Sequence, residues 1–177
     1  VVYKNDNLIT REDIIKHIVA LSQDDPIIST TGKASRELFE IREANNEPHK
    51  YDFLTVGSMG HASSIALGVA INKPTKKIWI IDGDGAVLMH MGAMPVIGNI
   101  KPNNLVHVVI NNASHETVGG MPTVAMNIDF SKIAYDCGYE SVVSVSNFDD
   151  LDEALKKAKE NNVLTFIEVK SSIRSEE

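Results

Sequence analysis

A Gly-Asp-Gly triplet that directly follows an apolar segment is the feature of this sequence that most restricts its fold. Residues 78–81 predict a strand buried on both faces, and the triplet stands at 83–85. After 25 further residues, a second apolar segment at 105–110 ends in an asparagine pair at 111–112. Open α/β sheets bind their ligands at polar turns that follow the carboxyl ends of parallel strands. The spacing therefore predicts one ligand site made by these two turns.

The residue types in the two turns indicate what kind of ligand they bind. Gly83 and Gly85 allow backbone amides to approach an anion closely, because neither residue has a side chain. Asp84 supplies a carboxylate and Asn112 an amide oxygen, and both are ligands that Mg²⁺ accepts. A diphosphate bridged to the protein by a divalent cation fits this pairing best.

Other interpretations of the triplet fit less well. The dinucleotide fingerprint requires a third glycine where this chain has Leu88. A calcium-binding EF-hand loop could begin at Asp82 and Asp84, but the apolar residues at 86–88 interrupt it. An ordinary glycine-rich turn between a strand and a helix remains the simplest alternative.

Apolar periodicity and capping residues predict alternating helices and strands. Strands are expected at 27–30, 52–56, 78–81, 105–110, 140–145 and 163–169. Helices are expected at 11–22, 130–137 and 148–161, and one helix each after the turns at 30–32 and 83–85, with a further helix that includes Gly57. We therefore expect one α/β domain with a doubly wound, mostly parallel sheet of about six strands and helices on both faces.

Two segments are expected to lack regular structure. Residues 113–129 are polar, contain two glycines and are long for a connection, which suggests a functional loop. His115 and Glu116 are adjacent titratable residues on this loop. The tail at 171–177 is expected to be frayed.

Composition excludes several classes of protein. The formal net charge of −7 argues against nucleic acid as the main partner. We expect no membrane-spanning segment and no signal peptide. Cys137 is the only cysteine, so no disulfide framework exists, and a reducing cytoplasm is the expected location. A chain that begins at Val1 is also compatible with one half, or a processed subunit, of a longer protein.

Four blocks of sequence resemble a known family of thiamine-diphosphate enzymes. The blocks TTGKASRELFE, DFLTVGSMGHASSIALG, GDGAVLMHMGAMPVIG and NLVHVVINNASHETVGGMPT resemble the C-terminal half of phosphonopyruvate decarboxylases. The β subunit of sulfopyruvate decarboxylases is similar. The resemblance implies thiamine diphosphate and Mg²⁺ as cofactors. It also implies a partner, either a pyrimidine-binding domain or an α subunit with the glutamate that activates the cofactor, in a homo- or hetero-oligomer.

Carried over by position, the resemblance implies a set of cofactor-binding residues. Mg²⁺ would be held by the Asp84 carboxylate, the Asn112 amide oxygen and the Ser114 backbone carbonyl, with Asn111 second to Asn112. Glycine-containing turns would bind the diphosphate through Thr31, Gly32, Gly83, Gly85, Ala86 and Val87. The turn at 57–60 would hold the two rings, with Met59 between them, Ser58 beside it and the Gly57 carbonyl bonded to the 4′-amino group.

The resemblance also implies a reaction, the decarboxylation of phosphonopyruvate to phosphonoacetaldehyde. His115 and Glu116 would transfer protons, while Lys33 and Arg36 would bind the phosphonate of the substrate. From the residues alone, Lys33 and Arg36 fit equally well on a solvated helical turn paired with Glu37 or Glu40. Sulfopyruvate or another 2-oxoacid, carboligation of the acetolactate-synthase type, and a non-catalytic cofactor-binding subunit are the alternatives.

Overall fold

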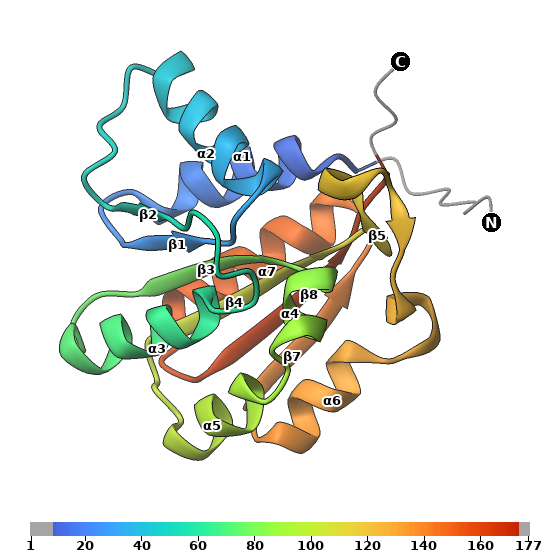
Figure 1. The fold of residues 1–177 in the computed structure, drawn as a ribbon. Helices are drawn as coiled ribbons and strands as arrows, with labels where there is room; N and C mark the ends of the chain where they lie inside the picture. The colour runs from blue at the N-terminus through green and yellow to red at the C-terminus, as the bar shows by residue number, and fades with distance from the viewer. Residues whose placement is uncertain (1–8, 174–177) are drawn as a thin grey trace.

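The computed structural model describes residues 9–173 and contains a sheet of six parallel strands in the order β2-β1-β3-β4-β8-β7 (Figure 1). Every neighbouring pair in this sheet is parallel. The strands are β1 (Ile27–Ser29), β2 (Asp52–Leu54), β3 (Ile78–Gly83), β4 (Leu105–Asn111), β7 (Ser141–Val145) and β8 (Thr165–Lys170). The predicted fold class and number of strands are confirmed.

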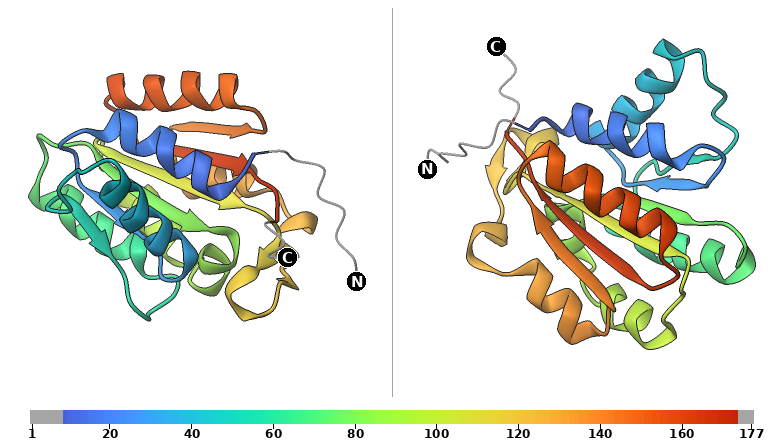
Figure 2. Two further views of the ribbon diagram at one scale, coloured as in Figure 1. Left: turned by 90° about the horizontal axis from the view of Figure 1, so that it is seen from above. Right: turned by 180° about the vertical axis from the view of Figure 1, so that it is seen from behind.

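Helices cover both faces of the sheet (Figure 2). One face carries α1 (Arg11–Ser22), α2 (Lys33–Ala44) and α7 (Phe148–Glu160). The other carries α3 (Ala62–Asn72), α4 (Asp84–Met89), α5 (Ala93–Ile100) and α6 (Phe130–Cys137). Central strands are therefore buried on both sides: in β3, Trp79 and Ile81 pack toward the first group of helices, and Ile78 and Ile80 toward the second.

Two helices differ from their predicted extent. The single helix expected after residues 83–85 is two helices, α4 and α5, because Pro95 has no amide proton and fits only near a helix start, here in the first turn of α5. The helix expected to include Gly57 begins only at Ala62. Gly57 and Gly60 have positive φ angles of 73° and 89°, which a helix does not allow, so residues 57–61 form a turn.

The segment predicted as a long functional loop contains short regular elements. Strands β5 (Ser114–His115) and β6 (Met121–Pro122) pair antiparallel, and the 3₁₀ helices η1 (Glu116–Val118) and η2 (Val124–Asn127) complete the segment. The tail predicted to be frayed is bonded at its start. The Ser171 amide donates to the Asn111 carbonyl, and residues 174–177 lie outside the described part of the chain.

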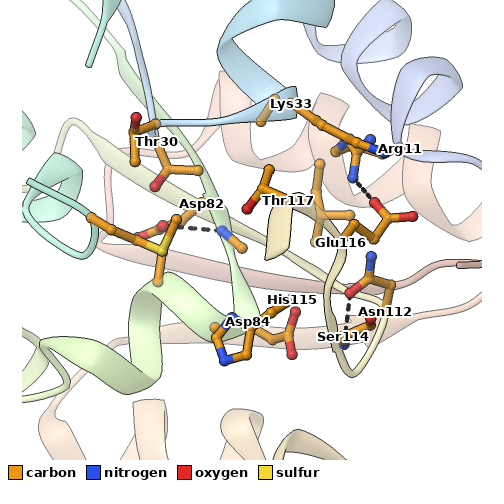
Figure 3. Close-up of a pocket in the computed structure, with 17 residues that line it drawn as sticks. Arg11, Thr30, Lys33, Asp82, Asp84, Asn112, Ser114, His115, Glu116 and Thr117 are labelled. Atoms are coloured by element: carbon orange, nitrogen blue, oxygen red, sulfur yellow. Dashed lines mark hydrogen bonds and ion pairs between the residues drawn. The ribbon is translucent and has the colours of Figure 1, made fainter. Parts of the chain in front are cut away.

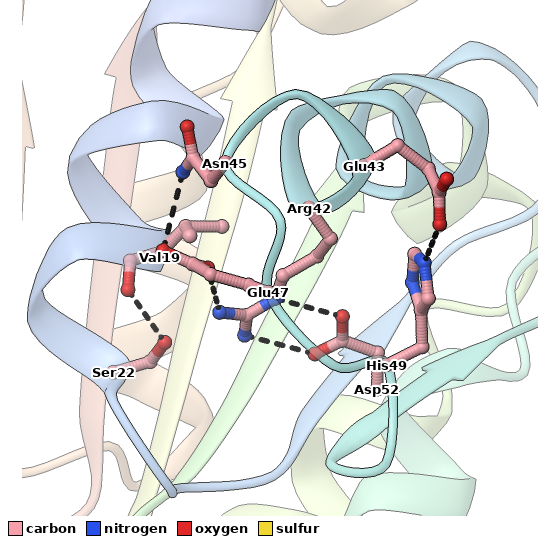
Figure 4. Close-up of polar contacts among 8 residues, drawn as sticks. All are labelled: Val19, Ser22, Arg42, Glu43, Asn45, Glu47, His49 and Asp52. Carbon is pink, nitrogen blue, oxygen red and sulfur yellow. Dashed lines mark hydrogen bonds and ion pairs between the residues drawn. The ribbon is translucent and has the colours of Figure 1, made fainter.

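An ion pair holds the edge of the sheet next to α2 (Figure 4). Arg42, which is 4% exposed, donates to both carboxylate oxygens of Asp52, from Nε at 3.0 Å and from Nη2 at 3.1 Å. Its Nη1 donates to Glu47 at 2.7 Å. The bidentate pair fixes the start of β2 against α2, and thereby also fixes the turn that follows β2.

The packing of α5 against α6 yields a stability prediction. A Cβ atom at Gly98 would lie 1.8 Å from the Cys137 carbonyl oxygen, whereas a Cβ at Gly68 in α3 would meet nothing within 4 Å. We expect Gly98→Ala to lower the free energy of unfolding by about 1–3 kcal/mol. The matched variant Gly68→Ala should raise it by up to about 1 kcal/mol, because alanine favours a helix. Urea unfolding of both variants tests this, and equal effects would contradict the packing.

Candidate functional site

The main candidate site lies where β1, β3 and β4 end at the same edge of the sheet (Figure 3). β1 pairs with β2 on one side and with β3 on the other, so the chain order of the strands reverses between β1 and β3. Such switch points are where open α/β sheets form ligand crevices. The residues that follow the three strands, Thr30, Asp84 and Asn112, all line the pocket.

The structure brings most of the predicted site residues together. Those that line the pocket are Thr31, Lys33, Met59, Gly83, Asp84, Gly85, Ala86, Asn112, Ser114, His115 and Glu116. Predicted residues outside its lining are Gly32, Gly57, Ser58, Val87 and Arg36. Val87 belongs to the hydrophobic core, and Arg36 is exposed on α2. Thr30, in the turn predicted at 30–32, also lines the pocket. Lining residues that were not predicted are Arg11, Ala34, Asp82, Ile110 and Thr117.

Asp84 is the most buried carboxylate in the pocket wall after Asp82, with 2% of its surface exposed. Burial raises the pKa of Asp84, while hydrogen bonds from Thr123 and the Gly85 amide and the charge of His115 oppose that rise. Its carboxylate accepts a hydrogen bond from the Thr123 hydroxyl. A buried carboxylate beside other oxygen atoms suits a bound divalent cation, whose charge would favour the ionised form.

The two asparagines point in different directions. Asn111 donates from its amide nitrogen to Glu168 at 2.7 Å and accepts from the Ala113 amide at 3.0 Å, so both polar atoms of its side chain are bonded within the protein. Asn112 lines the pocket, and its amide oxygen accepts from the Ser114 amide at 2.9 Å. Of the two, Asn112 is the asparagine that lines the pocket.

Two hydroxyl groups in the pocket wall have no partner within residues 9–173. Thr30 Oγ1 and Ser114 Oγ are buried and form no hydrogen bond there. Buried hydroxyls are normally paired, so an unpaired one in a pocket points to a ligand. Together with the Asp84 and Asn112 oxygens they form an oxygen-rich wall, which fits both a hard cation and the oxygens of a phosphate group.

Glycines allow loops to pack closely around the pocket. A Cβ at Gly85 would lie 2.4 Å from the His115 ring, and one at Gly32 would lie 3.0 Å from the Thr117 methyl carbon. A Cβ at Gly60 would lie 2.8 Å from the carbonyl oxygen of Ala86 in α4. These close approaches hold the segment 115–117 and the turn at 57–61 against the rest of the site.

Arg11 is a lining residue that the sequence did not reveal. It is the first residue of α1, and it forms ion pairs with Glu37 of α2 and Glu116 of η1. Glu116 is 105 positions away in sequence, so no local motif connects the two residues. Lys33 also lines the pocket, and Glu37 forms an ion pair with Arg11.

A series of hydrogen-bonded, buried polar side chains supports the end of β3, which leads into the Gly-Asp-Gly turn. His107 contacts Asp82 through Nε2 at 3.3 Å and Tyr139 through Nδ1 at 3.0 Å. Asp82 in turn accepts from the Gly83 amide at 3.0 Å. Burial raises the pKa of Tyr139 far above its ordinary range, so its hydroxyl keeps its proton. The chain fixes the end of β3, from which the triplet extends.

A doubly wound sheet with an oxygen-lined pocket at its switch point defines a cofactor-binding α/β domain. The particular family follows from sequence comparison. The chain belongs to the thiamine pyrophosphate enzymes, because residues 30–169 match the family described as "Thiamine pyrophosphate enzyme, C-terminal TPP binding domain".

Relatives within this family confirm the resemblance drawn from the sequence. Phosphonopyruvate decarboxylase of Streptomyces viridochromogenes is 38% identical over 150 residues, which cover 84% of this chain and 36% of that protein. Sulfopyruvate decarboxylase subunit beta of Methanocaldococcus jannaschii is 35% identical over 150 residues, which cover 84% of this chain and 76% of that subunit. The chain thus spans about a third of the first relative and most of the second.

A solved structure confirms the fold at much lower identity. Benzoylformate decarboxylase of Polynucleobacter necessarius superposes with a TM-score of 0.81 at 12% identity, over 99% of this chain and 36% of that one. None of the helices among residues 9–173 has the length and apolar character needed to cross a membrane.

The contact between His115 and Gly85 gives a prediction for the site. Gly85→Ala would force the His115 ring to move, whereas a Cβ at Gly83 would meet nothing within 4 Å. We expect Gly85→Ala to destabilise the domain by about 1–3 kcal/mol and to shift the ring resonances of His115. Gly83→Ala should leave those resonances in place. Unfolding curves and histidine NMR spectra of the two variants provide the check, and unmoved His115 resonances in Gly85→Ala would rule out the contact.

Proposed function

We propose that this chain is the diphosphate-binding half of a thiamine-diphosphate- and Mg²⁺-dependent enzyme that converts phosphonopyruvate to phosphonoacetaldehyde and CO₂, a step of phosphonate biosynthesis. The observation that carries the proposal is the oxygen-rich pocket at the switch point, which contains Asp84, Asn112 and two buried hydroxyls that find no partner among the described residues. The relative with 38% identity is named for the same reaction.

The pocket residues divide into a cation side and a phosphate side. Asp84, Asn112 and the Ser114 carbonyl would bind Mg²⁺, and the amide oxygen of Asn112 would exchange its bond from the Ser114 amide for the cation. The amides of Gly85 and Ala86 lie in the first turn of α4 and would donate hydrogen bonds to phosphate oxygens. The Thr30 hydroxyl would donate to the same group.

On the ring side, the bound cofactor would supply an electron sink for the loss of CO₂. Met59 lines the pocket beside the turn at 57–61, where it would support the rings. The Thr31 hydroxyl accepts from the Gly57 amide at 3.1 Å, which fixes that turn relative to the diphosphate side. His115 would handle a proton near the reacting carbon. Lys33 is better placed than Arg36 to bind the anionic end of the substrate.

The proposal includes a partner. A pyrimidine-binding domain or α subunit would supply the activating glutamate and cover the pocket, in a homo- or hetero-oligomer in the cytoplasm. Exposed apolar side chains in the segment that contains Ser114 and His115 would lie against it, and they are Val118, Met121, Val124 and Met126. This domain on its own is therefore expected to bind cofactor weakly and to show no turnover.

Sulfopyruvate is the second candidate substrate. The relative named for it is a separate subunit, and this chain covers 76% of its length. Both substrates carry an acidic group next to the 2-oxoacid, and the same lysine would serve either. A non-catalytic cofactor-binding subunit is the remaining alternative.

A direct test measures CO₂ release by the complete enzyme, this chain with its pyrimidine-binding partner, in the presence of thiamine diphosphate and Mg²⁺. Phosphonopyruvate and sulfopyruvate are offered in parallel. We expect turnover of phosphonopyruvate that needs both cofactors. Preference for sulfopyruvate would change the substrate and keep the mechanism, and no turnover of either despite bound cofactor would refute the proposed reaction.

Removal of the proposed cation ligand gives a second test. Asp84→Ala should reduce turnover by more than about 100-fold and raise the Mg²⁺ concentration needed for half-maximal activity, because the cation loses its only carboxylate ligand in the proposed set. Asp129→Ala, which removes the exposed N-cap of α6, is the control for general loss of stability. Full activity of Asp84→Ala would favour the non-catalytic alternative.

A further inference from the structure

Asp84 is held by a residue from a distant part of the chain. The Thr123 hydroxyl donates a hydrogen bond to Oδ2 of the Asp84 carboxylate, across 39 positions of sequence. Both residues are buried, with 6% of Thr123 and 2% of Asp84 exposed. Asp84 lines the pocket together with Asn112 and Ser114 (Figure 3), whereas Thr123 is not part of the lining. Thr123 therefore contacts the proposed cation ligand without being a ligand itself.

The backbone around Thr123 fixes where its hydroxyl lies. The Thr123 amide donates to the Ala113 carbonyl at 2.9 Å, and the strand just before it, β6, pairs with β5. The hydroxyl oxygen accepts from the Ala125 amide at 3.2 Å, as the N-cap of η2. Because this oxygen accepts a hydrogen bond on one side, its own proton can be directed to Asp84 on the other.

The bond from Thr123 differs from the other hydrogen bonds of the carboxylate. The backbone amides of Gly85 and of Asp84 itself also bond to the carboxylate, and both belong to the first turn of α4. Thr123 donates from the segment between β4 and α6, so it fixes the carboxylate relative to a separate part of the site. Its bond occupies Oδ2 and restricts rotation of the carboxylate, so Oδ1 is the oxygen better able to meet a cation.

Mg²⁺ and Ca²⁺ differ in what they require of a carboxylate. Mg²⁺ is small, needs nearly ideal octahedral geometry and keeps several of its water molecules. Ca²⁺ accepts about six to eight oxygens at longer distances and often takes both oxygens of one carboxylate. A carboxylate with one oxygen already bonded to a hydroxyl suits Mg²⁺ better than Ca²⁺.

We propose that Thr123 is a positioning residue that acts through Asp84, restricts its carboxylate to coordination by one oxygen and thereby makes the site select Mg²⁺ over Ca²⁺. The inference rests on the proposed function and deepens it, because it names what determines the choice of cation. Removal of the hydroxyl would weaken Mg²⁺ binding, since the carboxylate loses its orientation. It would leave Ca²⁺ binding largely intact, since both oxygens become available. A role in support of the fold alone would weaken the two cations alike.

The experiment measures thiamine diphosphate binding to the complete enzyme, without substrate, while Mg²⁺ or Ca²⁺ is titrated. The result therefore does not depend on the proposed reaction. We expect Thr123→Val, which removes the hydroxyl and keeps the shape, to raise the Mg²⁺ concentration at half-maximal binding by about tenfold or more, and the Ca²⁺ concentration by less than about threefold. Unchanged Mg²⁺ binding, or an equal loss for both cations, would overturn the proposal.

Asn147 provides a matched control, because it makes the same two kinds of bond outside the pocket lining. It caps α7 by accepting from the Asp150 amide at 2.9 Å, and it donates to the Asp150 carboxylate at 2.6 Å. Asn147→Ala should lose a cap and a carboxylate bond and still bind both cations normally. If it changed the ratio of Mg²⁺ to Ca²⁺ affinity as Thr123→Val does, the effect would be a general one and the proposal would be wrong.

Two smaller variants isolate the hydroxyl even if Thr123→Val does not fold. Thr123→Ser and Thr123→Ala both lack the methyl group and differ from each other by one oxygen atom. The serine variant should bind Mg²⁺ within about threefold of the unmodified enzyme, and the alanine variant about tenfold or more weakly. Equal Mg²⁺ binding by the two would refute the role of Thr123 and leave the proposed function intact. Cofactor binding that needs no divalent cation in the unmodified enzyme would refute both.

Discussion

The parallel pairing of β3 with β4 is the constraint on which the site depends. Gly83 is in register with Ile110, so Asp84 follows β3 at the level of Asn111, one position before Asn112 follows β4. Ile78 to Ile81 and the apolar residues of β4 hold this register through burial on both faces. A shift of one strand by a single position would separate the carboxylate from the amide and would turn buried side chains to the wrong face.

Two kinds of contact complete the site around Asp84 and Asn112. Some are close approaches that only a glycine permits, and others are hydrogen bonds between buried polar side chains. Gly85 leaves space for His115, Gly32 for Thr117 and Gly60 for α4. The buried chain from Tyr139 to Asp82 fixes the end of β3 from inside the domain. The strand side of the pocket is therefore held by hydrogen bonds inside the domain, whereas the segment 115–117 is held by its contacts with Gly85, Gly32 and Arg11.

The sequence predicted the sheet and the two polar turns that line the pocket because both follow from short-range patterns. Apolar runs identify β3 and β4, and the residues after them are polar. It could not predict Arg11, whose partner Glu116 lies far away in the chain. Nor could periodicity find the break between α4 and α5 or the true start of α3, where Pro95 and two positive φ angles override apolar patterning. Long-range pairing and backbone geometry are what a local pattern lacks.

The hydrogen bonds between Ser172 and Ile9 affect how such a domain can be joined to others. The Ser172 amide and hydroxyl both donate to the Ile9 carbonyl, at 2.8 Å and 3.1 Å. The backbone therefore enters and leaves the described fold at one point, beside the end of β8. A second domain can be joined to either end of the described fold without a connection that crosses the sheet. The same architecture can then serve as a segment of a long polypeptide or as a separate subunit with no change in its pocket.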